Sequence, residues 1–245
     1  MHYGYKLYLS NFINMSAKGG SFWIPYADLM TVLMVLFLFI SISYMAMVQK
    51  KFSDYSGTRT EIYNELDSVF KNDFQRWNIV LEEDLSIKFT NPQVLFESGK
   101  DEINPTFQNT LEEFIPKYIS VINKPKYKDA IAEVRIEGHT DNKKITDGRT
   151  GDPFIDNMEL SQSRARNVLA FFRNTKAFNK LNQEDKEKLT YLVTANGLSY
   201  GRMLNDNDSL SYKAKSGKIS QNKSRRVEFR IISATDKILS DKIKK

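Results

Sequence analysis

The sequence contains no cysteine and only two histidines, His2 and His139. The absence of cysteine excludes disulfides, thiol catalysis and cysteine-ligated metal ions. Two histidines argue against a histidine-rich metal site and against a Ser-His-Asp triad. The sequence also lacks zinc-finger, helix-turn-helix and RNA-recognition signatures, and its net charge of +6 is spread along the chain. We therefore predict a protein that is not an enzyme, needs no cofactor or metal, and does not bind nucleic acid directly.

Charge is absent from the twenty residues between Leu29 and Val48. Twenty residues of helix span about 30 Å, which is the thickness of a bilayer core. A cleaved signal peptide is the alternative, but the apolar run is longer than such a peptide needs, and Tyr44–Met47 offers no small-x-small cleavage site. We predict a transmembrane helix over residues 22–48.

Asp28 is the one ionisable group of the Asp, Glu, Lys, Arg and His set within residues 22–48. A carboxylate near hydrocarbon costs about 2.5 to 3.5 kcal/mol on insertion scales, so acids in this position are usually functional. Thr31 is the nearest polar neighbour on the same side of the helix. We predict that Asp28 carries a proton and that Thr31 supports the ion pathway. The alternative is an early helix residue near the interface, stabilised by the helix dipole.

The rest of the chain alternates between helical and strand patterns. The order of the patterns predicts an α+β domain over residues 79–233, with helices on one face of a mixed sheet. A partly helical juxtamembrane linker over residues 49–78 precedes the domain, and a basic tail over residues 234–245 follows it. The expected elements of the domain are two short strands within 79–89, helices over 104–122 and 158–174, a long loop over 139–157, and strands over 131–136, 191–194 and 227–232.

Five short patches occur in a fixed order along this domain, at residues 94–99 (VLFESG), 138–141 (GHTD), 157–165 (NMELSQSRA), 197–199 (GLS) and 225–228 (RRVE). In order and spacing they resemble the OmpA-like peptidoglycan-binding family. A peptidoglycan stem peptide carries diaminopimelate, whose ammonium an aspartate can bind and whose carboxylate an arginine fork can hold. The resemblance implies these roles for Asp141 and Arg164, with Asn157, Leu160 and Arg225 around the pocket. We expect His139 to be a packed residue and not a ligand.

Each of these assignments has a simpler alternative. Asp141 could cap a turn, Arg164 could be a solvated helix charge, and Arg225 could be a strand-edge charge that discourages aggregation. Three departures from the family's pattern bear on how a ligand is held: the long loop over residues 142–156, Ser224 in place of an asparagine, and Met203 in place of a proline.

The segment Trp23–Thr31, which reads WIPYADLMT, resembles the stretch around the proton-carrying aspartate of MotB-type stator subunits. As a whole, the chain resembles the ZorB family of the Zorya anti-phage defence systems most closely. The resemblance implies a proton-driven motor, in which a homodimer of this chain sits inside a ring of five ZorA-like or MotA-like subunits and is anchored to peptidoglycan. The implied location is the bacterial inner membrane, with residues 1–21 as a cytoplasmic leader and the C-terminal domain in the periplasm.

Two other functions are open at this point, namely a flagellar MotB-type stator subunit and a passive anchor between inner membrane and cell wall. The linker over residues 49–78 has 30 residues, fewer than flagellar stator subunits usually have, and this favours the ZorB family. Asp28 argues against the passive anchor, because an anchor has no use for an acid within the membrane.

Overall fold

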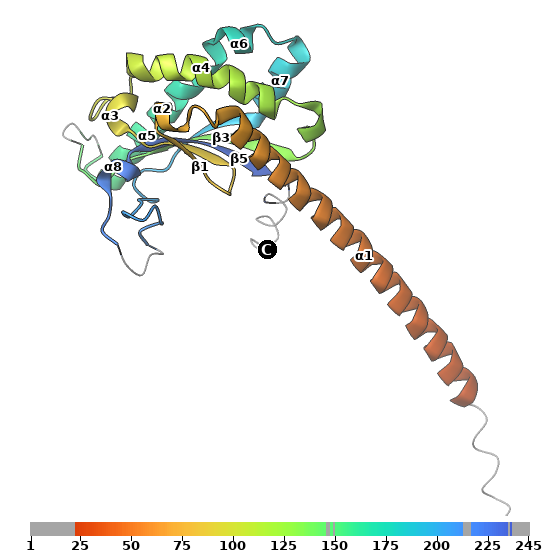
Figure 1. The fold of residues 1–245 in the computed structure, drawn as a ribbon. Helices are drawn as coiled ribbons and strands as arrows, with labels where there is room; N and C mark the ends of the chain where they lie inside the picture. The colour runs from red at the N-terminus through yellow and green to blue at the C-terminus, as the bar shows by residue number, and fades with distance from the viewer. Residues whose placement is uncertain (1–22, 146–147, 149, 213–216, 235, 237–245) are drawn as a thin grey trace, which may run out of the picture. The chain divides into compact units, whose positions relative to one another are not determined.

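The computed structural model describes residues 23–145, 148, 150–212, 217–234 and 236 (Figure 1). The predicted leader over residues 1–21 lies outside the described residues, as does the predicted tail apart from Ala234 and Asp236. The chain divides into two compact units, residues 1–53 and residues 54–245. The first unit contains the apolar part of helix α1 (Trp23–Phe70), and the second contains the α+β domain.

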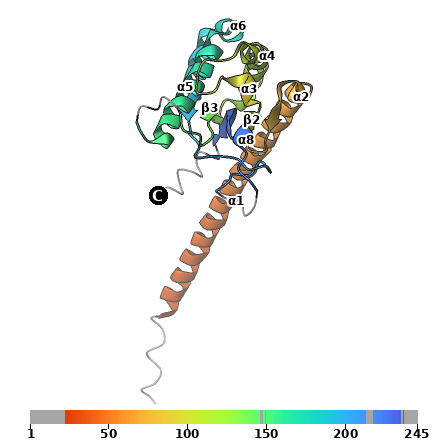
Figure 2. The same ribbon diagram turned by 90° about the vertical axis from the view of Figure 1, so that its left-hand side faces the viewer.

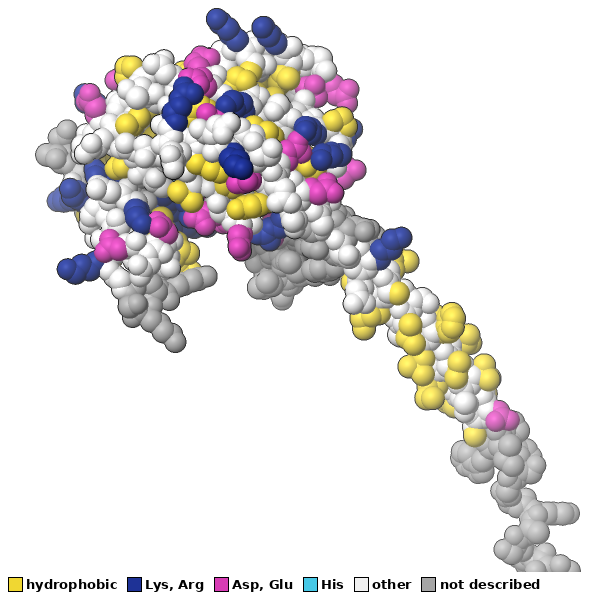
Figure 3. Space-filling model, viewed as in Figure 1, with side chains coloured by type: hydrophobic (Ala, Val, Ile, Leu, Met, Phe, Trp, Pro, Cys, Tyr) yellow, Lys and Arg dark blue, Asp and Glu magenta, His cyan; other side chains and the backbone are white. Residues whose placement is uncertain are grey.

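Within α1, Tyr26–Lys50 is long and apolar enough to cross a membrane, with a mean hydropathy of 2.4 and none of it buried. Figure 3 shows apolar side chains gathered along this stretch of the helix. A soluble protein would bury such a surface, because helices with an apolar surface on all sides are found in cores or in membranes. The sequence-based prediction of a long apolar helix here is confirmed.

The α+β domain contains a five-stranded sheet with the strand order β1-β2-β5-β3-β4. The pair β3–β4 is parallel and the other neighbours are antiparallel, so the predicted mixed sheet is confirmed. The strand predicted over 191–194 lies later in the chain, because residues 191 and 192 complete helix α7 (Gln183–Leu192). The strands are β1 (Ile79–Leu81), β2 (Ser86–Phe89), β3 (Ile131–His139), β4 (Val193–Gly197) and β5 (Arg226–Ser233).

The two longest helices of this domain, α4 (Pro105–Ile122) and α5 (Pro153–Asn174), lie on one face of the sheet (Figures 1 and 2). Helix α5 begins before the predicted residue 158, because the Asp152 side chain accepts a hydrogen bond from the backbone N–H of Phe154 and caps the helix. The predicted long loop is therefore shorter. The short elements are α2 (Phe74–Trp77), α3 (Pro92–Leu95), the 3-10 helix Pro125–Tyr127, α6 (Lys176–Asn179) and α8 (Gln221–Ser224).

An aromatic cluster fills the space between the helices and the sheet. The Phe114 ring of α4 lies 4.9 Å from that of Phe229 on β5 and 5.1 Å from that of Phe89 on β2. Phe70, at the end of α1, stacks on Phe114 at 4.9 Å. Aromatic contacts of this kind add about 0.5 to 1.5 kcal/mol each beyond the burial of apolar area.

The end of α1 belongs to this core, although its residues were predicted to form a linker. The side chains of Ile62, Leu66 and Phe70 are all 0% exposed. Polar contacts also hold this helix: Glu65 pairs with Lys124 and accepts a hydrogen bond of 2.6 Å from the Tyr127 hydroxyl. A domain that began at residue 79 would lack these three apolar side chains.

We predict that Leu66→Ala lowers the unfolding free energy of residues 54–245 by about 2 to 5 kcal/mol, because it leaves a cavity in the core. Asn64→Ala, at an exposed position on the same helix, is the matched control and should change it by less than about 0.5 kcal/mol. Chemical denaturation measures both values. Equal stability of the two variants would show that the end of α1 does not contribute to the folded domain.

Candidate functional site

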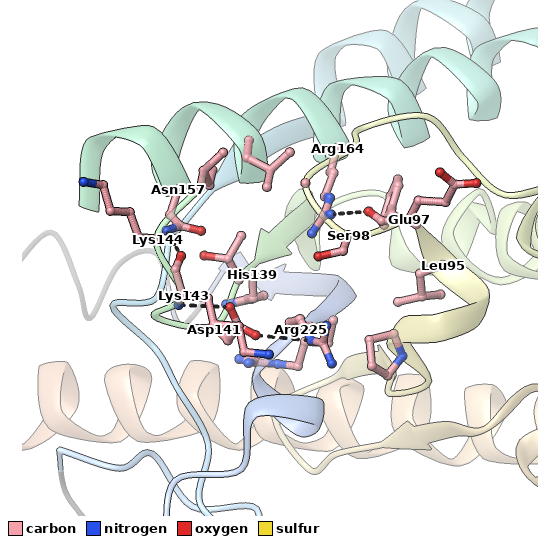
Figure 4. Close-up of a pocket in the computed structure, with 17 residues that line it drawn as sticks. Leu95, Glu97, Ser98, His139, Asp141, Lys143, Lys144, Asn157, Arg164 and Arg225 are labelled. Carbon is pink, nitrogen blue, oxygen red and sulfur yellow. Dashed lines mark hydrogen bonds and ion pairs between the residues drawn. The ribbon is translucent and has the colours of Figure 1, made fainter. Parts of the chain in front are cut away.

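A cavity of about 140 Å³ lies beside the ends of β3 and α3 and along α5 (Figure 4). All five residues predicted to surround a binding pocket line it: Asp141, Asn157, Leu160, Arg164 and Arg225. They come from the loop after β3, from α5 and from the residue before β5. The structure therefore brings the predicted residues together, while their ligand stays a prediction.

Arg164 is buried in the wall of this cavity, with 7% of its surface exposed. It lies in the middle of α5, because the helix begins at Pro153 and not at the predicted residue 158. Its Nε donates to the carbonyl of Lys100 at 2.8 Å, its Nη2 donates to the carbonyl of Glu97 at 3.1 Å, and the guanidinium lies 4.8 Å from the centre of the Phe96 ring.

Burial, reinforced by Arg225, lowers the pKa of Arg164 to about 10, so the side chain stays protonated at neutral pH. All of its direct partners are uncharged, and no carboxylate of the described residues forms an ion pair with it. A buried cation without an anionic partner is costly. The site is therefore suited to an anionic group of a ligand, and the interpretation of Arg164 as a solvated charge is wrong.

Asp141 follows β3 and is also buried. Its Oδ1 accepts a hydrogen bond of 3.1 Å from the backbone N–H of Lys143, so the carboxylate does cap a turn. Its Oδ2 lies 3.4 Å from Nε of Arg225, and both of these atoms are buried without a hydrogen bond. One carboxylate oxygen thus shapes the loop, and the other faces the cavity, where a donor from a ligand could satisfy it.

Asn157 and Leu160 line the cavity from the first turns of α5. The Asn157 amide donates to the carbonyls of Lys143 and Pro153, both at 2.9 Å, and so ties the loop after β3 to the helix. Leu160 is partly buried and supplies an apolar wall.

Two glycines of the sequence patches allow α5 to approach the sheet closely. A Cβ at Gly138 would lie 2.2 Å from the carbonyl oxygen of Ser161, and a Cβ at Gly197 would lie 2.4 Å from the backbone nitrogen of Gln162. Any side chain at these positions would push the helix outward. The Gln162 amide also donates a hydrogen bond to the carbonyl of Ala195 and accepts one from the backbone N–H of Gly197, both on β4. These two bonds fix the distance between α5 and the sheet.

A buried group of charges on β3 and β5 was missed by the sequence analysis. The Glu228 carboxylate accepts hydrogen bonds from Nε of Arg226 at 2.5 Å and from Nη2 of Arg230 at 2.9 Å. Glu228 lies opposite Glu137 in the sheet. Burial raises the pKa of Glu228, but the charges of His139, Arg226 and Arg230 outweigh it and hold this pKa well below its usual range. A signal was present, because charged residues alternate along both strands at 133, 135, 137 and at 226, 228, 230.

His139 is buried among these charges, as expected for a packed residue. Its Nε2 lies 3.6 Å from Oε2 of Glu137 and 3.6 Å from Oε1 of Glu228. These three side chains are close enough to hold a metal ion. However, Arg226 and Arg230 already pair with the carboxylates, so we interpret the cluster as an ion-pair network.

In the first unit, Asp28 and Thr31 both lie on α1. The Thr31 hydroxyl donates to the carbonyl of Ala27 at 2.8 Å, within the helix's own backbone. Asp28 is exposed on the helix surface. The roles predicted for these two residues stay predictions.

Residues 95–184 match the sequence model of the OmpA family. Similar proteins include Zorya protein ZorB of Escherichia coli strain Crooks, which is 35% identical over 219 residues that cover 86% of this chain and 87% of that protein. Zorya protein ZorB of Escherichia coli O139:H28 is 26% identical over 218 residues, which cover 86% of this chain and 79% of that protein. Among solved structures, a MotB-like protein from Desulfovibrio vulgaris has a TM-score of 0.48 and 21% identity, covering 73% of this chain and 93% of that one.

The apolar helix, the α+β fold and the family match define a membrane-tethered protein with an OmpA-like domain. More narrowly, the chain belongs to the ZorB family, with which it shares most of its length. The sequence analysis assigned the chain to this family, and that assignment is confirmed.

We predict that the unfolding free energy of residues 54–245 falls as the pH drops from 7 to 5. Burial, together with the charge of Arg226, lowers the pKa of His139 in the folded state. As the pH falls below about 6.5, the unfolded chain therefore binds a proton at this histidine while the folded chain does not, and stability is lost. The loss amounts to at most about 1.4 kcal/mol per pH unit below that value.

His139 is the only histidine of residues 54–245, so His139→Gln should flatten this part of the profile. Glu228, whose pKa is lowered, adds a loss of stability only below about pH 4.3. Denaturation curves at several pH values measure the profile. The same decline in the variant and the wild type between pH 7 and pH 5 would contradict the assignment to His139.

Proposed function

We propose that this chain is the wall-anchored subunit of a proton-driven inner-membrane motor of the Zorya type, which acts in defence against phage. The proposal depends on one observation, which is that a single chain combines two features. An acid, Asp28, lies in an apolar helix of membrane length, and a buried arginine without an anionic partner, Arg164, lines a cavity. Membership of the ZorB family supports defence over flagellar motility.

The proposed wall ligand is the diaminopimelate of a peptidoglycan stem peptide. Its carboxylate would bind the Arg164 guanidinium, whose carbonyl partners occupy Nε and Nη2 and leave Nη1 for the ligand. Its ammonium would bind Oδ2 of Asp141, which is buried without a hydrogen bond. Asn157 holds the loop between them, and Leu160 contacts the aliphatic part of the ligand.

We predict that Arg164→Ala and Asp141→Ala each abolish sedimentation of residues 54–245 with purified peptidoglycan. Each change removes one half of a charged clamp, worth about 2 to 5 kcal/mol when the other charge stays buried. Arg166→Ala, at an exposed position on the same helix, is the matched control and should sediment like the wild type. Full binding by both cavity variants would rule out this cavity as the peptidoglycan site.

The proposed power source is a proton carried by Asp28. The membrane potential supplies about 2.3 kcal/mol per charge per 100 mV, and a group that alternates between charged and neutral forms can use it. Asp28 is the only acid between Tyr26 and Lys50. Two copies of this chain would sit inside a ring of five ZorA-like or MotA-like subunits, and proton passage would turn the ring. The passive anchor is the competing function.

The proposed orientation follows from the wall ligand. Peptidoglycan lies outside the inner membrane, so the domain must be periplasmic and the leader over residues 1–21 cytoplasmic. Thr31 lies one turn further along α1 than Asp28. Its hydroxyl can accept a hydrogen bond while it donates to Ala27, and in this way it could support proton transfer to Asp28.

We predict that Asp28→Asn eliminates phage protection while membrane insertion, assembly with the partner ring and peptidoglycan binding persist. Asparagine keeps the size and polarity of aspartate but cannot titrate. Asp28→Glu, the matched control, still titrates and should keep part of the protection. Phage plating assays measure the effect, and normal protection by Asp28→Asn would identify a passive anchor.

A further inference from the structure

A second, shallow cavity of about 320 Å³ adjoins the first. Its lining consists of amide, hydroxyl and proline side chains, namely Asn78, Thr90, Asn91, Pro92, Gln93 and Asn222. None of these side chains carries a charge, whereas lysines, arginines and acids line the first cavity. We propose that the second cavity binds an uncharged, hydroxyl- and acetamido-bearing sugar of the peptidoglycan glycan strand.

One shared lining residue and one hydrogen bond connect the two cavities. Pro92 lines both of them. Asn222 of the second cavity accepts a hydrogen bond of 2.8 Å from Nη2 of Arg225, which lines the first. Next to it, the Gln221 amide donates to Asn142 in the loop after β3 at 2.9 Å. A ligand with a charged part and an uncharged part could therefore occupy both cavities at once.

The available hydrogen-bonding groups suit a sugar. The side-chain amides of Asn78, Asn91 and Gln93 make no hydrogen bond within the described part of the chain, so each offers a donor and an acceptor. The Thr90 hydroxyl instead donates to the carbonyl of Asn78 at 3.0 Å and fixes the wall of the cavity. Pro92 adds an apolar surface against which the C–H face of a sugar ring can pack.

Peptidoglycan presents these chemical groups side by side. The stem peptide is joined by an amide bond to the lactyl group of the sugar, so the attached disaccharide has no charge, while the diaminopimelate further along the peptide has several. The inference rests on the proposed function, because the peptide part would occupy the first cavity. It adds that the wall anchor recognises the sugar as well as the peptide.

Calorimetric titration of the full-length protein in detergent tests this inference. The probes are the diaminopimelate-containing stem peptide alone and the same peptide attached to its disaccharide. We expect the wild type to bind the sugar-bearing form about tenfold more tightly, as two or so extra hydrogen bonds would provide. Asn91→Ala/Gln93→Ala should lose this gain and keep the affinity for the peptide alone. Gln183→Ala, an exposed amide on α7, is the matched control and should behave like the wild type.

The outcomes separate the inference from the proposed function. Equal affinity of the wild type for both probes, or an undiminished gain in the double variant, would overturn the sugar site while peptide binding stands. Binding of neither probe would overturn the peptide site and the sugar site together.

Discussion

Removing a charge from water is costly unless a partner replaces the water, and this cost governs the structure at three places. On β3 and β5 the protein supplies the partners itself: Glu228 is 0% exposed but bonds two arginines. At Arg164 the protein supplies only backbone carbonyls and an aromatic ring, so the positive charge can still pair with an anion. At Asp28, on the membrane-length helix, the described residues supply no ion pair. Arg164 and Asp28, which have no counter-ion among the described residues, are both residues to which we assign a proposed function.

The ion-pair network and the candidate site depend on the same two strands. His139 and Arg226 are opposite each other in the register of β3 and β5, and both line the first cavity. Asp141 follows β3 closely, and Arg225 directly precedes β5. The network therefore fixes the two strand ends that carry these side chains, while Gly138 lets α5 bring Arg164 toward them. A change in the network would therefore shift these strand ends and alter the shape of the first cavity.

Much of this arrangement was predictable from the sequence. The apolar run, the alternation of strands and helices, and the five ordered patches identify the membrane helix, the α+β fold and the residues that line the first cavity. The helix boundaries were harder to predict, because α5 begins at a capping residue, Asp152, whose hydrogen bond outweighs the loop-like composition around it. The role of the end of α1 depends on tertiary packing of Ile62 and Leu66, which periodicity alone cannot distinguish from a solvated helix. The second cavity could not be predicted at all, since it joins Asn78, Asn91 and Asn222 from distant parts of the chain.

In the proposed function, one chain transmits force between an intramembrane proton carrier and the cell wall. A protease site inserted between Ser53 and Asp54, at the boundary of the two units along the chain, tests this function most directly. Cells would express this chain with its partner genes and an inducible periplasmic protease, and phage plating would be measured before and after cleavage. The account predicts full protection before cleavage and none afterwards, although both fragments stay in the cell. Protection that persists after complete cleavage would contradict it.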